Sequence, residues 1–393
     1  MTSQADKNIK IGSNKPKLLF VITQGVWGGA QKYVFSHAKA LCGEFDVHVA
    51  IGEPSGKKDL QKAILRFNET SPGTISLISL MHLRRSISPI HDMAAIVELR
   101  SLMKALCPDV VHLNSSKAGV IGSLALPKKQ RAMYTVHGWV FNEPRNPHIN
   151  SLFRFLEKKA AKRRAKRGGT TILLSDQDKK MGNAILGNTP AAIIPIGIDP
   201  IDFHSREDAR RVLFETLPKE LAPTKLIGCV ANFYNTKGLD TLIAAAAMVP
   251  DATFVVIGEG PERKTLESLI SANSLSNRFF LTGAIPDAAT LMKAFDIAVI
   301  PSRKEGLPFT LLEWMSAEVP VIATDVGGIA SVIGNGVTGV LIAPEDASVL
   351  ASAINAHKQT TSVTDRAKDV ATSYTSEKTI AKFRRLVDSL RQL

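Results

Sequence analysis

The sequence predicts an α/β protein of two domains, each with a doubly wound and mostly parallel sheet. Three observations support this prediction. The chain has 393 residues, which is long enough for two domains of roughly 150–200 residues each. Short apolar runs that indicate buried strands alternate with helix-like segments, a pattern typical of parallel sheets. One stretch, residues 297–328, contains a strand, a polar loop, a helix and a second strand in succession.

The first domain is expected to span residues 17–199. Apolar runs predict its strands at residues 17–23, 46–52, 76–80, 110–114, 131–136, 171–175 and 192–198. Helices are expected between them, including an amphipathic helix that ends near Cys42 and another at residues 57–67. Residues 1–16 are polar and are expected to form a disordered leader.

The second domain is expected to span residues 200–374, after a turn-like boundary at residues 196–200. Its strands are predicted at residues 226–231, 253–257, 279–281, 297–300, 319–323 and 340–342. An alanine-rich helix at residues 238–248 is expected to connect the first two strands. After Pro344 the chain is expected to be helical to its end.

Composition limits where the protein works. No run approaches the ~20 apolar residues of a membrane-spanning helix, and the N-terminus lacks the apolar core of a signal peptide. Cys42, Cys107 and Cys229 are widely separated in apolar surroundings. We expect all three to be buried, and neither a disulfide framework nor a metal site is predicted. The sequence therefore predicts a cytoplasmic protein.

The net charge of +13 is the unusual feature of the composition. It favours an anionic partner: a nucleotide substrate, nucleic acid or an anionic membrane surface. Much of the positive charge lies at residues 158–167, on an expected helix after Phe153 and Phe155. This basic run is either a solvated helix face or a site of peripheral contact with an anionic membrane. Nucleic acid is disfavoured, because no alternating aromatic residues are present to stack on bases.

The stretch at residues 297–328 carries the main functional signal. Its helix is expected to begin at Leu307 and Pro308, because proline is well suited to a first helical turn. Free N–H groups at such a helix start, after a strand, favour anions. Glu305 in the loop and Glu313 in the helix cannot bind a phosphate, but they can accept hydrogen bonds from sugar hydroxyls. Alternatively, both are solvated surface carboxylates.

Seven residues separate the two glutamates, and the motifs P-S-x-x-E-G-x-P and P-V-I-A-T-D-x-G-G frame them. This pattern, together with N-G-V-T-G at residues 335–339, resembles the signature of glycosyltransferase family 4. The resemblance implies a retaining enzyme of GT-B architecture, in which two Rossmann-like domains face a central cleft. The first domain would bind the acceptor and the second the nucleotide sugar. Residues 375–393 would form a helix that crosses back to the first domain.

The resemblance also suggests site residues in the first domain. Gly28 and Gly29 match the family's G-G-A-E turn, although Gln31 stands where the family often has Glu. His137, after the strand at residues 131–136, matches an H-G element, and its imidazole would contact the donor sugar. An ordinary loop and a buried structural histidine are the alternatives.

In the second domain, Lys237 and Gly238 match the family's G-R-L-x-x-x-K-G element, whose cations neutralise the donor diphosphate. Asn232 stands where that element has Arg, so one cation of the clamp is missing. Either Lys237 and backbone amides suffice, or a cation such as Arg303 or Lys304 substitutes. Gly258 begins a turn similar to the family's G-x-G-P element, where a nucleotide would approach the backbone; a plain tight turn is the alternative.

The resemblance implies that the start of the helix holds the diphosphate, through the residues Gly306, Leu307, Pro308, Thr310 and Leu311. Glu313 would bind the ribose and Glu305 the sugar, and His137, Lys237 and Glu305 would act in catalysis. No metal, other cofactor or protein nucleophile is expected. The predicted reaction moves a sugar from a nucleotide-diphosphate sugar, expected to be a UDP-sugar, to a glycan or lipid-linked acceptor. Two alternatives are a nucleotide-sugar epimerase of the same fold and a nucleic-acid-binding protein.

Overall fold

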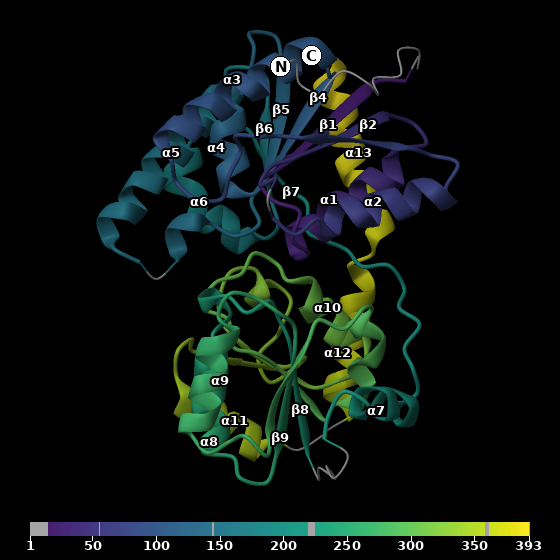
Figure 1. The fold of residues 1–393 in the computed structure, drawn as a ribbon, viewed down its shortest axis with the longest axis vertical. Coiled ribbons are helices and arrows are strands. Elements are labelled where there is room, and N and C mark those ends of the chain that lie inside the picture. Colours follow the sequence, from purple (N-terminus) through teal and green to yellow (C-terminus); the bar gives the residue numbers. More distant parts are fainter. Residues whose placement is uncertain (1–14, 55, 144, 219–224, 358–360, 393) are drawn as a thin grey trace.

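A computed structural model describes residues 15–54, 56–143, 145–218, 225–357 and 361–392. All but two residues of the expected leader, residues 1–16, lie outside this part of the chain. The molecule consists of two α/β lobes stacked along its long axis (Figure 1). The first lobe is formed by the N-terminal half of the chain together with the C-terminal helix.

Within the described residues, the N-terminal domain contains a parallel seven-stranded sheet with the order β3-β2-β1-β4-β5-β6-β7. The strands are β1 (Lys17–Ile22), β2 (Asp46–Ile51), β3 (Ile75–Ser79), β4 (Val110–Asn114), β5 (Arg131–Thr135), β6 (Thr170–Leu173) and β7 (Ala191–Ile193). The helices are α1 (Gly29–Leu41), α2 (Asp59–Thr70), α3 (Pro89–Leu106), α4 (Ser116–Ala125), α5 (Pro147–Ala165) and α6 (Asp176–Leu186).

The C-terminal domain repeats this plan with a parallel six-stranded sheet, in the order β10-β9-β8-β11-β12-β13 within the described residues. The strands are β8 (Leu226–Val230), β9 (Thr253–Ile257), β10 (Phe279–Gly283), β11 (Ile297–Ile300), β12 (Val321–Thr324) and β13 (Val340–Ile342). The helices are α7 (Arg206–Phe214), α8 (Leu239–Ala247), α9 (Arg263–Ala272), α10 (Phe309–Ser316), α11 (Ala347–Ala356) and α12 (Thr361–Ser373). The prediction of two doubly wound α/β domains is therefore confirmed.

Helices cover both faces of each sheet, because parallel strands are apolar on both sides. In the N-terminal domain, α3, α4, α5 and α6 pack on one face, and α1, α2 and the final helix α13 (Ser376–Gln392) on the other (Figure 1). In the C-terminal domain, α8, α9 and α11 cover one face, and α7, α10 and α12 the other.

The last helix returns to the N-terminal domain. Phe383 and Val387 of α13 are completely buried in the core of that domain, where the Phe383 ring lies 6.3 Å from the ring of Phe20. The chain crosses between the domains where residues 196–200 pass Thr375. A Cβ at Gly197 would lie 2.2 Å from the carbonyl oxygen of Thr375. The two segments that connect the domains can therefore pack this closely only with glycine at position 197.

Both sheets reverse their strand order at one point, and these points determine where a ligand can bind. β1 pairs with β2 on one side and β4 on the other, and β8 pairs with β9 and β11 in the same way. The loops that leave the carboxyl ends of such neighbouring strands diverge, which leaves room for a ligand. The predicted site residues follow β1, β5, β8, β9 and β11, at or next to these two points.

Several sequence expectations were wrong in detail. The strand expected at residues 192–198 ends at Ile193, since the chain then leaves the sheet toward Thr375. The strand expected at residues 319–323 begins only at Val321, because Pro320 has no N–H to donate to a ladder. Cys107 is exposed, at the left-handed residue that ends α3, whereas Cys42 and Cys229 are buried. Within the described residues, no helix is long and apolar enough to cross a membrane.

Candidate active site

Lys237 and Gly238 connect β8 to α8. Lys237 ends a short 3-10 turn, and Gly238 caps α8 with a left-handed φ of 63°. A Cβ at Gly238 would lie 2.0 Å from the carbonyl oxygen of Pro301, so glycine is required there by packing as well as by φ. The loop after β8 thereby lies directly against the loop after β11.

This packing brings together two of the predicted catalytic residues. The ammonium of Lys237 donates to Oε1 of Glu305 over 2.7 Å, and the hydroxyl of Ser302 donates to the same oxygen over 2.7 Å. The Glu305 side chain is 10% exposed. Its Oε2 has no partner within the described residues, and it is therefore available to a ligand hydroxyl.

The loop that carries Glu305 leads into α10. The helix begins at Phe309 and is capped by Pro308. Pro308 therefore lies one position before the first helical turn, whereas the sequence predicts it within that turn. The N–H groups of the first turn, including that of Thr310, have no carbonyl partner within the helix and form its positive end. This end of α10 lies beside the Lys237–Glu305 pair and suits an anionic group.

Leu307 and Leu311, which the resemblance assigns to the diphosphate site, mainly pack in the core. Leu307 and Leu311 have buried side chains that belong to the core of the C-terminal domain. The N–H of Leu311 donates to the carbonyl of Pro308 over 3.2 Å. Leu311 thus anchors the start of α10 and presents no free group in this conformation.

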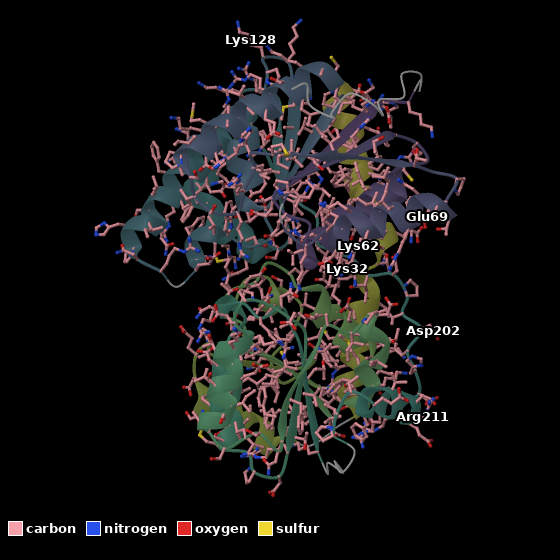
Figure 2. All side chains as sticks on the ribbon, in the orientation of Figure 1. Lys32, Lys62, Glu69, Lys128, Asp202 and Arg211 are labelled. Carbon is pink, nitrogen blue, oxygen red and sulfur yellow. The ribbon has the colours of Figure 1, made fainter. Side chains whose placement is uncertain are left out.

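Glu313 lies one turn into α10 and is almost fully buried, with 6% of its side chain exposed. Its carboxylate forms an ion pair with the ammonium of Lys32, from the first turn of α1 in the other domain. Figure 2 shows Lys32 at the boundary between the two domains. The two glutamates are therefore each paired with a lysine, and they lie in one region.

The Gly28–Gly29 turn at the start of α1 faces the C-terminal domain. Asn232 donates from Nδ2 to the carbonyl oxygen of Trp27 over 2.9 Å, and a Cβ at Gly28 would lie 3.1 Å from the same nitrogen. A Cβ at Gly29 would lie 3.8 Å from the ring of Phe309. The predicted Gly28, Gly29 and Asn232 are thus adjacent to each other and to the start of α10.

Gln31, where the family often has Glu, is buried and braces this turn. Its Nε2 donates to the carbonyl oxygen of Gln24 over 2.9 Å. A carboxylate could not donate this hydrogen bond. The departure from the family pattern therefore supports the geometry of the turn.

His137 follows β5 and lies behind the Glu305 loop. A Cβ at Gly138, whose φ is 102°, would lie 3.0 Å from the backbone nitrogen of Gly306 and 3.1 Å from the carbonyl carbon of Glu305. The H-G element of one domain and the E-G element of the other are therefore packed backbone against backbone. Only glycine permits both the φ and the close approach.

The imidazole of His137 is held in one orientation by the N-terminal domain. Its Nε2 lies 3.1 Å from Oδ1 of Asn114, and its ring lies edge-on to Tyr33 with the centroids 5.0 Å apart. Because an amide oxygen only accepts, Nε2 carries the proton and Nδ1 is an acceptor. Burial lowers the pKa of His137 to about 3, with a further contribution from His37, so the ring is neutral at physiological pH.

Two further histidines lie behind His137. Burial lowers the pKa of His37 to about 4 and holds the pKa of His112 well below its ordinary value. Nε2 of His112 is hydrogen-bonded to the hydroxyl of Thr135 over 2.8 Å, and Nδ1 of His37 donates to the carbonyl of Tyr33 over 2.8 Å. The N-terminal side of the site is therefore backed by neutral rings.

Packing within the C-terminal domain is enough to explain why position 258 is glycine, without a bound ligand. A Cβ at this residue, whose φ is 155°, would lie 1.9 Å from the carbonyl oxygen of Ala231, and the Gly258 N–H donates to Gly283 over 2.9 Å. The turn is thus tight because β9 packs closely on the end of β8.

Neither of the cations considered as a replacement for the missing Arg is available. Arg303 forms a bidentate pair with Asp240, at 2.8 and 2.7 Å, and a third bond to Glu345. Lys304 donates to Glu143 of the other domain over 2.6 Å, and burial, with Arg145 nearby, lowers its pKa to about 8. Both cations hold loops in place.

The basic run at residues 158–167 is only partly a solvated face. Arg164 is completely buried and donates to Ser123 and Thr171 over 2.7 Å each. Arg163 is half-buried and donates to the carbonyls of Ser123 and Leu126. The exposed cations of the run are Lys158, Lys159, Lys162 and Lys166.

Sequence reasoning missed Lys32, Tyr33 and Asn114. Lys32 and Tyr33 directly follow the glycine turn on α1, and Asn114 ends β4 at the point where the strand order reverses. Only Asn114 carried a usable signal, as a polar residue at a strand end. Within the described residues, no group of three or more His, Cys, Asp or Glu side chains is placed to hold a metal ion.

Comparison with known proteins identifies the class and then the family. The family model for glycosyltransferase family 4 matches residues 27–201, and the model for glycosyl transferases group 1 matches residues 215–370. Together with the two facing α/β domains, these matches define a glycosyltransferase of the GT-B type. The chain belongs to glycosyltransferase family 4.

One relative and two solved structures are similar to this chain. An Escherichia coli UDP-Gal:α-D-GlcNAc-diphosphoundecaprenol α-1,3-galactosyltransferase is 28% identical over 67% of this chain and 69% of its own length. Sucrose-phosphate synthase from Thermosynechococcus elongatus has the same fold, with a TM-score of 0.79, 20% identity and coverage of 96% and 99%. HepE from Anabaena, in complex with UDP-glucose, aligns with a TM-score of 0.76, 20% identity and coverage of 96% and 100%.

Proposed function

We propose that this glycosyltransferase moves a sugar from a UDP-sugar to an acceptor hydroxyl with retention of the anomeric configuration. The proposal rests above all on the Lys237–Glu305 pair beside the positive end of α10, with Glu313 one turn further on. A lysine and a helix N-terminus suit a diphosphate, and buried carboxylates suit sugar hydroxyls. The E. coli relative is named for UDP-galactose and the Anabaena protein binds UDP-glucose, which supports this donor class.

In the proposed reaction the bond between the anomeric carbon and the diphosphate breaks, and a bond to the acceptor oxygen forms on the same face. The acceptor proton passes to the departing phosphate oxygen. Lys237 and the backbone N–H groups at the start of α10 stabilise the charge that grows on the diphosphate. Glu313 binds the ribose hydroxyls and Glu305 a hydroxyl of the sugar. The step as proposed uses neither a protein nucleophile nor a metal.

His137 has a supporting role in this proposal. Its proton points to Asn114, so its Nδ1 accepts a hydrogen bond from a hydroxyl of the donor sugar. Gly28 and Gly29 lie opposite the start of α10, where backbone without side chains lets the acceptor domain approach the donor closely.

The acceptor in this proposal is a lipid-linked saccharide of surface polysaccharide or lipopolysaccharide synthesis. The E. coli relative is named for a diphosphoundecaprenol acceptor. Apolar side chains are exposed on the outer helices of the N-terminal domain: on α3, Ile90, Met93 and Val97, and on α5, Leu152 and Phe155. Together with the exposed lysines of the basic run, they suit peripheral contact with an anionic membrane. Phe153, by contrast, packs against the core.

The two alternatives make different predictions. An epimerase would change the donor sugar without an acceptor, and a nucleic-acid-binding protein would have no use for the buried Glu313. The test is to incubate the purified protein with UDP-, GDP- and ADP-sugars, with and without a lipid-linked saccharide, and to analyse transfer, hydrolysis and epimerisation separately. DNA binding is measured in parallel. Transfer that requires a UDP-sugar supports the proposal, and epimerisation without acceptor contradicts it.

The roles of the two glutamates sharpen this test. Glu313→Gln should weaken the binding of UDP and of the UDP-sugar alike, because both contain the ribose. Glu305→Gln should spare UDP binding and reduce transfer, because Glu305 is assigned to the sugar. Equal losses of UDP affinity in the two variants, measured by calorimetry, would contradict this division of roles.

A further inference from the structure

The proposed donor site has one cation fewer than its family pattern implies, since Asn232 replaces Arg. Within the described residues, the nearby cations of the C-terminal domain have other partners: Arg303 pairs with Asp240 and Glu345, and Arg263 with Glu259 and Glu267. Lys304 pairs with Glu143. If Lys237 and backbone amides do not suffice, a replacement cation has to come from another part of the molecule.

Lys32 of the N-terminal domain is in the right place. Its ammonium is paired with Glu313 and lies 5.0 Å from the centroid of the Phe309 ring. Phe309 is the first residue of α10, so this cation lies at the helix end where the diphosphate is expected. The backbone that carries it is adjacent to Asn232, through the contact of Asn232 with Trp27.

The charges of the site also favour a role for Lys32 beyond its ion pair. Without ligand, two lysines are balanced by two glutamates, Lys237 with Glu305 and Lys32 with Glu313. A bound diphosphate adds negative charge at the start of α10, and the ribose hydroxyls donate to Glu313. The Lys32 side chain is 39% exposed, so its ammonium can bridge Glu313 and a phosphate oxygen without leaving a buried charge unpaired.

We propose that Lys32 is the second cation of the diphosphate clamp, supplied by the N-terminal domain in place of the missing Arg at position 232. This inference rests on the proposed function, because it concerns the same nucleoside-diphosphate site. The clamp is then complete only when the two domains are in contact. The diphosphate is then held by Lys237 from one domain and Lys32 from the other.

The test compares UDP and uridine binding by calorimetry in Lys32→Gln, Lys32→Arg and wild type. Loss of one charge-assisted contact should weaken UDP binding about tenfold more than uridine binding. Uridine has no phosphate, so its binding reports only the effect of the change on Glu313 and the ribose. Lys32→Arg should retain most of the UDP affinity. Lys39→Gln, an exposed lysine on the same helix, is the matched control and should bind UDP like wild type.

A second variant separates a clamp from a simple ion pair. Adding Asn232→Arg to Lys32→Gln restores a cation at the position the family uses, and should recover UDP binding. If Lys32→Gln binds UDP as tightly as wild type, or more tightly, Lys32 only competes for Glu313 and the inference is wrong. If wild type and Lys39→Gln bind no UDP either, the proposed function fails and this inference with it. Thermal melts of each variant exclude loss of folding as the cause.

Discussion

The two domains present different chemistry to the same site. The C-terminal domain contributes ions: Lys237 with Glu305, the buried Glu313 and the positive end of α10. The N-terminal domain contributes His137, with a pKa of about 3, backed by His37 and by other rings that burial keeps neutral. Among the described N-terminal residues, three charged side chains contact the C-terminal loops of the site: Lys32, Glu143, which is paired with Lys304, and Arg85, which lies over the ring of Tyr234.

This difference follows from what each side has to bind. A diphosphate carries charge that increases as the sugar leaves, so fixed ions of the opposite sign bind the transition state more tightly than the ground state. Sugar and acceptor hydroxyls are neutral, and neutral donors and acceptors recognise them without adding charge to a partly dry site. Lys32 and Glu313 form one of the ion pairs at which the two kinds of surface meet.

The largest effect is expected at the charged side. Lys237→Ala should lower kcat/KM, because the lysine stabilises the departing diphosphate. The loss should correspond to an increase of about 2–4 kcal/mol in the activation free energy. Steady-state kinetics with the preferred UDP-sugar measure this loss. Normal kinetics in a variant that melts like wild type would exclude Lys237 from the clamp. The C-terminal side of the site would then not act through this charge.

The neutral side predicts a pH dependence of stability. His37, His112 and His137 bind protons below about pH 6.5 when unfolded, but their folded pKa values are lowered. The unfolded state therefore gains protons first as the pH falls, and the folded state loses about 1.4 kcal/mol per pH unit for each histidine. This stability is complete above pH 6.5 and is lost progressively toward pH 4.

Buried acids oppose this trend. Burial raises the pKa of Glu157 to about 7 and that of Asp178 to about 6, so these groups favour the folded state as the pH falls toward 4. A variant is therefore needed to isolate the histidines. Between pH 6 and 4, His137→Asn should reduce the pH slope of the unfolding free energy by about 1.4 kcal/mol per unit. Urea unfolding at several pH values measures it, and an unchanged slope would show that His137 is not held neutral.

The charged side was more predictable from the sequence than the neutral side. The strand and helix around Glu305 were predicted from a local apolar run and from Pro308, and the structure contains both within two residues of the expected bounds. The approach of Lys237 to Glu305 follows from topology, because β8 and β11 are neighbours and both residues lie just beyond the strand ends. Their catalytic roles remain predictions.

Contacts between the domains could not be predicted in this way. Lys32 and Glu313 are 281 residues apart, and no local pattern links them. The burial of Arg163 and Arg164 was missed for a related reason. A run of charges indicates solvent in a single sequence, whereas here α5 turns two of its arginines inward toward the carbonyls and hydroxyls of neighbouring elements. Such partners become visible only once the helices are packed.

The smallest effect on the site is expected from changes at the surface of α5. These changes also test whether the positive charge on the N-terminal domain acts away from the site. One variant replaces the exposed cations of the basic run by glutamate: Lys158, Lys159, Lys162 and Lys166. Each exposed lysine contributes at most about 1 kcal/mol to attraction by an anionic leaflet. The variant should therefore lose binding to vesicles that contain anionic lipid while it binds UDP like wild type. Arg163 is left unchanged, because its hydrogen bonds hold α5 against α4.

A matched control reverses four exposed lysines in other parts of the molecule: Lys39, Lys264, Lys378 and Lys382. It carries the same change in net charge, so it should retain vesicle binding only if the α5 surface itself docks. Wild-type binding should also weaken in ~0.5 M salt, where screening shortens the reach of charge to about 4 Å. Flotation with neutral and anionic vesicles decides the matter. Equal binding to both kinds of vesicle, or equal losses in the two variants, would contradict docking through α5. A soluble acceptor would then become the better hypothesis.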